Sequence, residues 1–100
     1  MVKHIILWTL KEMSEEEKIA VKAGIKSGLE GLKGKIPGLL EIKVVAEGRL
    51  ESSTADLMLD STFESFGALK AYSKHPEHVK VADEKVHPFT ASRACLDFEV

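Results

Sequence analysis

The stretch Val2 to Leu10, which reads VKHIILWTL, decides the fold. Successive side chains of a strand point to opposite faces, so the even-numbered positions from His4 onward share one face while Ile5 and Leu7 lie on the other. Both faces are apolar, which predicts a central strand that is covered on both sides. His4 ends an otherwise apolar row, a setting more typical of a hydrogen-bonded core histidine than of a catalyst.

Composition indicates one globular domain. Of the 100 residues, 44% are apolar and 30% are charged, and the net charge is −2. The Lys and Arg residues are dispersed among acids, so we expect no nucleic-acid partner. The single cysteine, Cys95, fits a reducing compartment and is expected to be a small buried apolar side chain. The apolar run Ile5 to Trp8 is too short for a membrane span or a signal peptide, which favours a cytoplasmic protein without a membrane partner.

A long helix should follow the first strand. Ser14 and Glu17 match a capping box, and the helix is expected to run to about Lys33 or Lys35. One stripe at helical spacing is apolar and should face the sheet: Val21, Ile25, Leu29, Leu32 and Ile36. The positions expected to face water are Lys22, Lys26, Glu30 and Lys33.

Beside the apolar stripe runs a ridge of small residues, namely Ala20, Gly24, Ser27, Gly28 and Gly31. An interior glycine costs a helix up to ~1 kcal/mol relative to alanine, so the presence of three glycines in this helix has to be explained by its packing or by function. Close approach of the helix to the sheet is the preferred explanation. Room for a ligand between helix and sheet is the alternative.

Three more strands and a second helical region complete the chain. Alternation predicts strands over 39–46, 55–63 and 92–100, with Leu40, Ile42, Val44 and Ala46 on one face of the first of these. Ser65 should cap a helix that carries Phe66, Leu69 and Tyr72 on one side. After Pro76 the next helical stripe is Val79, Ala82 and Val86.

The order strand, helix, strand, strand, helix, strand is the ferredoxin-like βαββαβ arrangement. Its four-stranded antiparallel sheet has both helical regions on one face, which makes this an α+β fold. The opposite face would carry an apolar set with nothing in the chain left to cover it: Ile5, Leu7, Met58, Leu96 and Phe98. Such a face usually marks an interface, and we expect a homodimer that pairs the two sheets.

The joint between the last two helical segments concentrates reactive groups. Tyr72 through His78 contains a phenol, two imidazoles and a carboxylate. Pro76 should end one helix at His75 and begin the next, which puts His78 in a first turn. There the helix dipole favours a neutral imidazole, as a general base requires, although Glu77 acts in the opposite sense. Alternatively, His75 and His78 only cap and solvate the junction.

Several segments resemble the stress-responsive α/β-barrel (Dabb) domain family, over nearly the whole of residues 1–100 as a single domain. They are Lys3–Trp8, Leu32–Gly38, Phe63–Ser65, Tyr72–His78 and Arg93–Phe98. The resemblance implies a ferredoxin-like protomer and a dimeric α+β barrel. It also implies a parallel with a plant branch that cyclises linear polyketides without a cofactor, in a cavity between sheet and helices.

The acid–base residues of that plant branch would fall on His4, Tyr72 and His78, and Asp97 is expected to orient His78. Two positions depart from the pattern. Leu57 stands where those cyclases have a further histidine, and Ser73 replaces a bulkier apolar residue. The apolar end of the cavity is therefore expected to differ.

Three hypotheses of function follow. The first is a dimeric protein that binds a small, largely apolar ligand without turnover. The second is a cofactor-independent cyclase, lyase or isomerase on a carbonyl substrate: His78 takes a proton, Asp97 fixes its tautomer, and Tyr72 and His4 stabilise the oxyanion. The third is a metal site made of His75, His78 and a carboxylate, which lacks a clear third ligand. We therefore expect neither a cofactor nor a metal.

Overall fold

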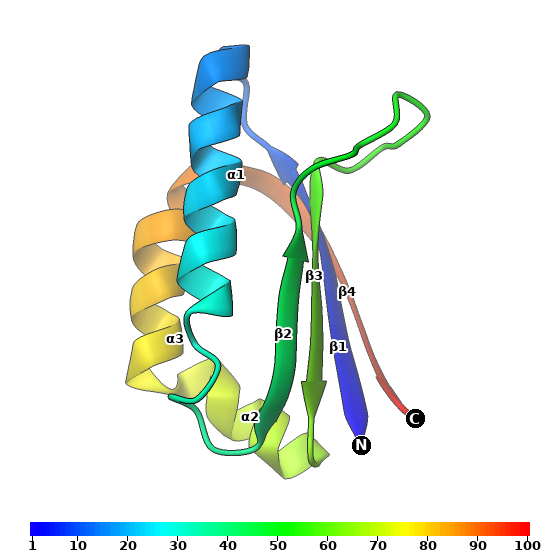
Figure 1. The fold of residues 1–100 in the computed structure, drawn as a ribbon, viewed down its shortest axis with the longest axis vertical. Coiled ribbons are helices and arrows are strands. Elements are labelled where there is room, and N and C mark those ends of the chain that lie inside the picture. The colour runs from blue at the N-terminus through cyan, green and yellow to red at the C-terminus, as the bar shows by residue number, and fades with distance from the viewer.

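The computed structural model describes residues 1–100 and confirms the ferredoxin-like arrangement. The elements are β1 (Val2–Leu10), α1 (Glu15–Glu30), β2 (Leu39–Val45), β3 (Leu57–Phe63), α2 (Phe66–Lys74), α3 (Pro76–Val81), the π-helical turn η1 (Ala82–Val86), the 3₁₀ turn η2 (His87–Phe89) and β4 (Thr90–Glu99). The sheet has the order β2-β3-β1-β4, and each neighbouring pair is antiparallel. All helices lie on one side of it (Figure 1). None of them is both long enough and apolar enough to span a membrane.

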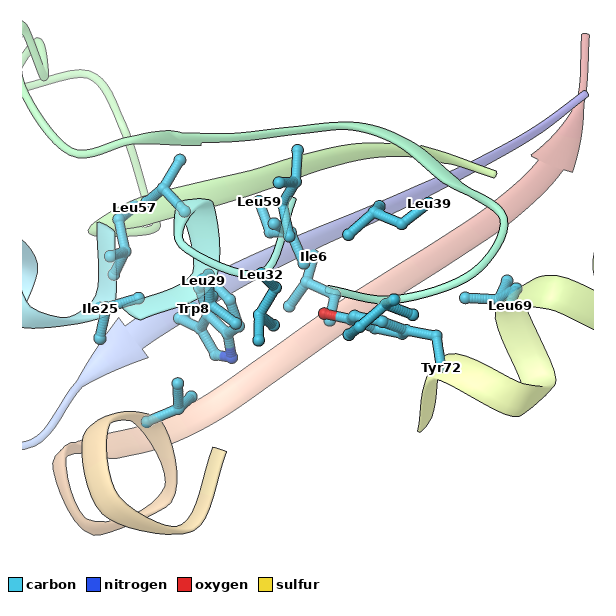
Figure 2. Close-up of a cluster of buried hydrophobic side chains, with 14 of the residues drawn as sticks. Ile6, Trp8, Ile25, Leu29, Leu32, Leu39, Leu57, Leu59, Leu69 and Tyr72 are labelled. Carbon is cyan, nitrogen blue, oxygen red and sulfur yellow. The ribbon is translucent and has the colours of Figure 1, made fainter. Parts of the chain in front are cut away.

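The core fills the space between the sheet and the helices. Ile6 and Trp8 of β1 and Leu59 of β3 point into it, toward Leu29 at the end of α1 and Leu32 in the turn that follows (Figure 2). The predicted apolar residues are buried except Val21, which is half-buried, but only Val21, Ile25 and Leu29 belong to α1, and Leu32 and Ile36 lie in the turns that follow it. On α2, Leu69 and Tyr72 are buried as expected, whereas Phe66 is exposed.

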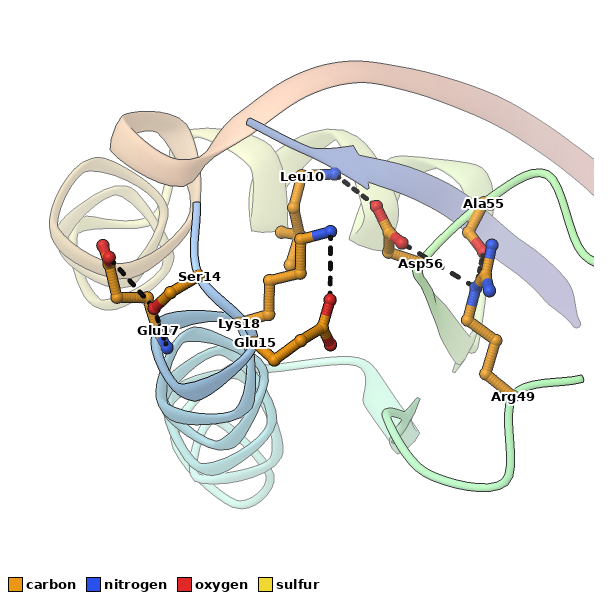
Figure 3. Close-up of polar contacts among 8 residues, drawn as sticks. All are labelled: Leu10, Ser14, Glu15, Glu17, Lys18, Arg49, Ala55 and Asp56. Atoms are coloured by element: carbon orange, nitrogen blue, oxygen red, sulfur yellow. Dashed lines mark hydrogen bonds and ion pairs between the residues drawn. The ribbon is translucent and has the colours of Figure 1, made fainter. Parts of the chain in front are cut away.

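The predicted start of α1 is confirmed, but its end is wrong. The Ser14 hydroxyl accepts a hydrogen bond from the backbone N–H of Glu17 and donates to its carboxylate (Figure 3). The helix ends at Glu30, before the expected Lys33 or Lys35. Gly31 caps it and Gly34 adopts a φ of +87°, a left-handed conformation that glycine adopts readily.

The small-residue ridge of α1 allows a close approach, but to the neighbouring helix and not to the sheet. A Cβ atom at Gly28 would lie 2.9 Å from Cγ1 of Val81, and one at Gly24 would lie 3.9 Å from Cδ of Lys85. The ridge therefore sets the distance between α1 and the α3–η1 segment. This placement corrects the expectation of contact with the sheet, and it gives no support to a ligand there.

Two residues that were expected to face water instead bind the edge of the sheet. Lys26 Nζ donates to the backbone carbonyl of Val44 at 2.8 Å, and Glu30 Oε2 accepts from the backbone N–H of Val44 at 2.9 Å. Lys26 and Glu30 also pair with each other at 2.9 Å. Their side chains occupy backbone groups on the outer edge of β2, which hinders pairing with another strand there.

A register shift changes one face of β2. Ile42 and Val44 are buried as expected, but Leu40 is exposed and Leu39 is buried in its place. The pairing with β3 shifts between Leu39 and Glu41, and such an irregularity reverses the alternation of side chains locally.

The face of the sheet that points away from the helices has no cover in the protomer (Figure 1). Leu7 is 43% exposed, Leu96 63% and Phe98 40%, which confirms the predicted apolar face. On this same side the β2–β3 loop projects beyond the sheet. Its base is held by Arg49, which donates to the Ala55 carbonyl at 2.7 Å and pairs with Asp56 (Figure 3).

Candidate functional site

A cavity of about 450 Å³ lies between the sheet and the second helical region. Strands β1 and β4 form its floor, and α2, α3 and η1 form its wall. Of its 19 lining residues, 11 are hydrophobic, so the site suits a small and largely apolar molecule. Its apolar lining includes Ile6, Trp8, Leu69 and Val86.

The structure brings His4, Tyr72 and His78 together on this cavity. The ring centroid of Tyr72 lies 4.1 Å from that of His78 and 6.2 Å from that of His4. The ring centroid of Phe63 lies 4.9 Å from that of Tyr72. Three residues that are far apart in the sequence thus converge as expected, although their catalytic role stays a prediction.

The helix junction explains how Tyr72 and His78 meet. The α2 helix begins where Ser65 accepts a hydrogen bond from Ala68, and it ends at His75. Nδ1 of His75 accepts from the backbone N–H of Glu77, so this histidine caps α3 and does not line the cavity. His78, in the first turn of α3, does line it. His75 therefore has the capping role that the sequence analysis gave as the alternative, whereas His78 lies where a reactive histidine was expected.

The third hypothesis, a metal site made of His75, His78 and a carboxylate, has no cluster of ligands to support it. His75 is engaged at the cap, and no carboxylate completes a cluster with the two imidazoles. The group of potential ligands that does come together is His4, Cys95 and Asp97.

Two buried polar atoms of the site have no hydrogen-bond partner in the protein. They are Oη of Tyr72 and Nδ1 of His78. Tyr72 is only 1% exposed, and its hydroxyl points from α2 toward the centre of the buried cluster (Figure 2). A buried polar group without a partner costs about 1–3 kcal/mol, so native proteins keep few of them. Both residues line the cavity, and neither atom has a partner within the protein.

Burial also sets the protonation states of this pair. It raises the pKa of the Tyr72 phenol well above its usual value, against a smaller opposing effect of Arg93, so the hydroxyl keeps its proton. Burial lowers the pKa of His78. The backbone of Ser73 raises this pKa, whereas electrostatic repulsion from His4, His87 and Arg93 lowers it further, so the net shift is downward. The site therefore pairs a proton donor with a neutral imidazole near pH 7.

Asp97 does not orient His78, which corrects the prediction. Its Oδ1 instead contacts Nδ1 of His4, because the antiparallel register of β1 and β4 places these two residues directly opposite each other. His78 therefore has no carboxylate to fix its tautomer. His4 is hydrogen-bonded, as the apolar setting of this histidine suggested.

Cys95 is exposed, so its assignment to the core is also wrong. Its thiol donates to Oδ1 of Asp97 at 3.5 Å and lies 3.8 Å from Nδ1 of His4. Partial burial and the Asp97 charge raise the pKa of the thiol. Sequence reasoning also missed Arg93, which lines the cavity. Alternation along β4 does place Arg93, Cys95 and Asp97 on one face, and only the position of that face over the cavity could not be read from it.

Comparison with known proteins agrees with this architecture. The family model of the stress-responsive A/B barrel domain matches residues 2–100. A stress-response A/B barrel domain-containing protein of Arabidopsis thaliana is 29% identical over 99 residues; the match covers 98% of this chain and 36% of that protein. The chain thus spans about a third of the length of this relative.

Two solved structures show the same fold. A dimeric protein of unknown function with a ferredoxin-like fold from Bacteroides fragilis is 34% identical, with a TM-score of 0.91 over 99% of this chain and 95% of that one. A dimeric ferredoxin-like protein from Thermobifida fusca is 20% identical, with a TM-score of 0.80 over 99% of this chain and 90% of that one.

Proposed function

Because this chain belongs to the stress-responsive A/B barrel domain family, we propose that it is a homodimer that binds a small, largely apolar molecule carrying a carbonyl or hydroxyl oxygen. The cavity under α2 and α3 is the binding site, and the open face of the sheet is the dimer interface. The dimeric state of the relative from Bacteroides fragilis supports the second part. So does the apolar face around Leu96, which water would otherwise cover.

The unpaired Tyr72 hydroxyl beside the unpaired Nδ1 of His78 is the observation that carries the ligand proposal. A ligand carbonyl would accept the phenolic proton, and His78 would bind a second polar atom of the same molecule. The apolar lining would hold the hydrocarbon part. A molecule of this kind gains hydrogen bonds that the protein alone leaves unmade.

Trp8 offers a direct test because it is the single tryptophan and lines the cavity. Acetophenone, which joins an aromatic ring to a carbonyl, is a suitable probe. We expect it to change the tryptophan fluorescence saturably, and we expect Tyr72→Phe to weaken its binding by roughly 5–150-fold, the equivalent of about 1–3 kcal/mol. Equal binding by wild type and Tyr72→Phe would contradict the site.

A matched pair of histidine variants controls for general effects of substitution. His78→Asn removes an imidazole from the cavity, whereas His75→Asn removes one from the cap and leaves a residue that caps helices well. We expect only the first to weaken acetophenone binding. A similar loss in both would point to damage at the helix junction in place of a ligand contact.

The second candidate function is acid–base catalysis, and the protonated Tyr72 next to a neutral His78 favours it. His78 would take a proton from the carbon beside a carbonyl: the C–H bond breaks, an N–H bond forms, and the electron pair moves onto the carbonyl oxygen. Tyr72 would donate its hydrogen bond to that oxyanion. His4, held by Asp97, has its ring centroid 6.2 Å from that of the phenol.

Deuterium exchange separates binding from catalysis. In deuterium oxide, an active site of this kind would exchange the methyl protons of acetophenone, followed by NMR, and His78→Asn would slow the exchange by about 10²–10⁴-fold. Saturable binding without enhanced exchange would leave the ligand-binding function alone.

A further inference from the structure

Three side chains of different chemistry meet on the floor of the cavity, where β1 lies beside β4. Asp97 stands opposite His4 in the register, and Cys95 stands opposite Ile6, two positions along, so all three point to the same face. One potential ligand atom from each, an imidazole nitrogen, a thiol sulfur and a carboxylate oxygen, lies within 4.8 Å of the other two. We propose that His4, Cys95 and Asp97 bind a divalent transition-metal ion, with Zn²⁺ the best match.

The three groups converge on a point and do not form a proton relay. In a relay built around a nucleophilic thiol, thiol and carboxylate contact opposite nitrogens of the imidazole. Here both Cys95 and Asp97 approach Nδ1 of His4. A shared focus suits a metal ion, which needs its ligands around a single centre.

Two of the three distances between the ligand atoms are close to those of a tetrahedral zinc site. Bond lengths of about 2.3 Å to sulfur and about 2.0–2.2 Å to nitrogen or oxygen place neighbouring ligand atoms roughly 3.3–3.6 Å apart. The sulfur of Cys95 lies 3.5 Å from Oδ1 of Asp97 and 3.8 Å from Nδ1 of His4. The hydrogen-bonded His4–Asp97 pair is closer than this spacing and must separate before both residues can bind one ion. The Asp97 side chain is 36% exposed and has room to do so.

The charge of the three side chains and their position beside the cavity also suit a divalent metal ion. A thiolate and a carboxylate together balance a divalent ion, and imidazole, thiolate and carboxylate are all ligands of zinc. Three protein ligands leave a fourth position, which would face the cavity because all three residues line it. Arg93, two residues before Cys95, also lines the cavity and would favour an anionic fourth ligand. This inference goes beyond the ligand proposal and does not depend on it.

Cobalt is a spectroscopic probe for the site. Adding Co²⁺ to metal-free protein should give visible d–d bands and a near-ultraviolet thiolate-to-cobalt band at one equivalent per chain, and Zn²⁺ should displace both. Mg²⁺ prefers oxygen ligands and should not. We expect Cys95→Ser to abolish the thiolate band and to weaken binding by at least about 100-fold, and Asp97→Asn to weaken it by at least about 10-fold. Absence of these bands, or their persistence in Cys95→Ser, would overturn the proposal.

Two controls keep the test decisive. His87→Asn removes an exposed histidine that pairs with Asp83 at 3.2 Å, and it should bind Co²⁺ like wild type. In the unmodified protein, Zn²⁺ should slow the reaction of the Cys95 thiol with iodoacetamide by at least about tenfold, a measurement that needs no variant. Unprotected Cys95 would count against the site, whereas acetophenone binding in the absence of metal would still test the ligand proposal separately.

Discussion

Both faces of the sheet carry large apolar side chains, and they differ in what covers them. On β1, Ile6 and Trp8 point to the helices and are buried, whereas their neighbour Leu7 points the other way and is 43% exposed. Alternation therefore tells which side chains share a face, but not which face the chain itself can cover. One layer of helices covers one face, and the other requires a second molecule.

The covered face is itself divided in two. Beneath α1 it is a dry apolar core, while toward β4 it becomes the polar floor formed by Arg93, Cys95 and Asp97. All residues of β4 after Ala91 are exposed in the protomer. The helical layer is thus incomplete over the β4 edge, and the candidate site lies where that layer ends.

The largest expected effect separates the two faces on a single strand. Leu59 and Met58 are neighbours on β3, with Leu59 buried under the helices and Met58 on the open face. We expect Leu59→Ala to lower the free energy of unfolding by about 2–5 kcal/mol, because it leaves a cavity in the core. Met58→Ala should cost less than half as much, with a loss that depends on protein concentration. Chemical denaturation measures both, and equal losses would remove the distinction between the faces.

A charged substitution on the open face of the sheet tests whether this face is the dimer interface. Leu96→Glu would place an unpaired carboxylate in the proposed dimer interface and should weaken self-association by at least about 100-fold, measured by light scattering across a dilution series. The control is Ile19→Glu on α1, a residue that is 69% exposed on the helical side of the sheet. If Leu96→Glu remained as dimeric as wild type, the partner would have to bind elsewhere.

Much of this architecture was predictable because it depends on local rules. The caps at Ser14 and Ser65, the break at Pro76 and the alternation of β1 and β3 each involve residues a few positions apart. The chain order of the elements then leaves few topologies. The convergence of His4, Tyr72 and His78 follows from the βαββαβ order, since it puts α2 and α3 over β1.

The predictions that were wrong share a different cause. Each of them concerned a position that depends on the register between distant segments. Asp97 meets His4 and not His78 because of the pairing of β1 with β4. Leu40 is exposed because β2 shifts against β3. The bonds from Lys26 to Val44 likewise depend on where α1 lies along the sheet, which no local pattern specifies.

The spacing of the helical layer over the covered face is tested by two glycines of α1. At Gly24 a new methyl group would meet only the flexible end of Lys85, so Gly24→Ala should stabilise the protein by up to about 1 kcal/mol through helix propensity. At Gly28 the methyl would press on Val81 at 2.9 Å, so Gly28→Ala should destabilise by about 1 kcal/mol. Thermal denaturation compares the two. Stabilisation by both would show that α1 and α3 are not in close contact.

The smallest expected effect is a pH dependence confined to the covered face. The folded state lowers the pKa of His78, so in the range between its folded and unfolded pKa values the unfolded chain binds the proton more readily. The stability that His78 contributes is therefore fully present above an unfolded pKa of about 6.5 and is lost as the pH falls through the lower folded pKa. Wild type should lose stability relative to His78→Asn when denaturation curves are compared from about pH 8 to about pH 5. A ligand that accepts a hydrogen bond from the imidazolium would reduce this loss, whereas a molecule bound on the open face would leave it unchanged. Parallel curves for the two proteins would mean that the imidazole is not buried against Tyr72, and the cavity would then lack its proposed base.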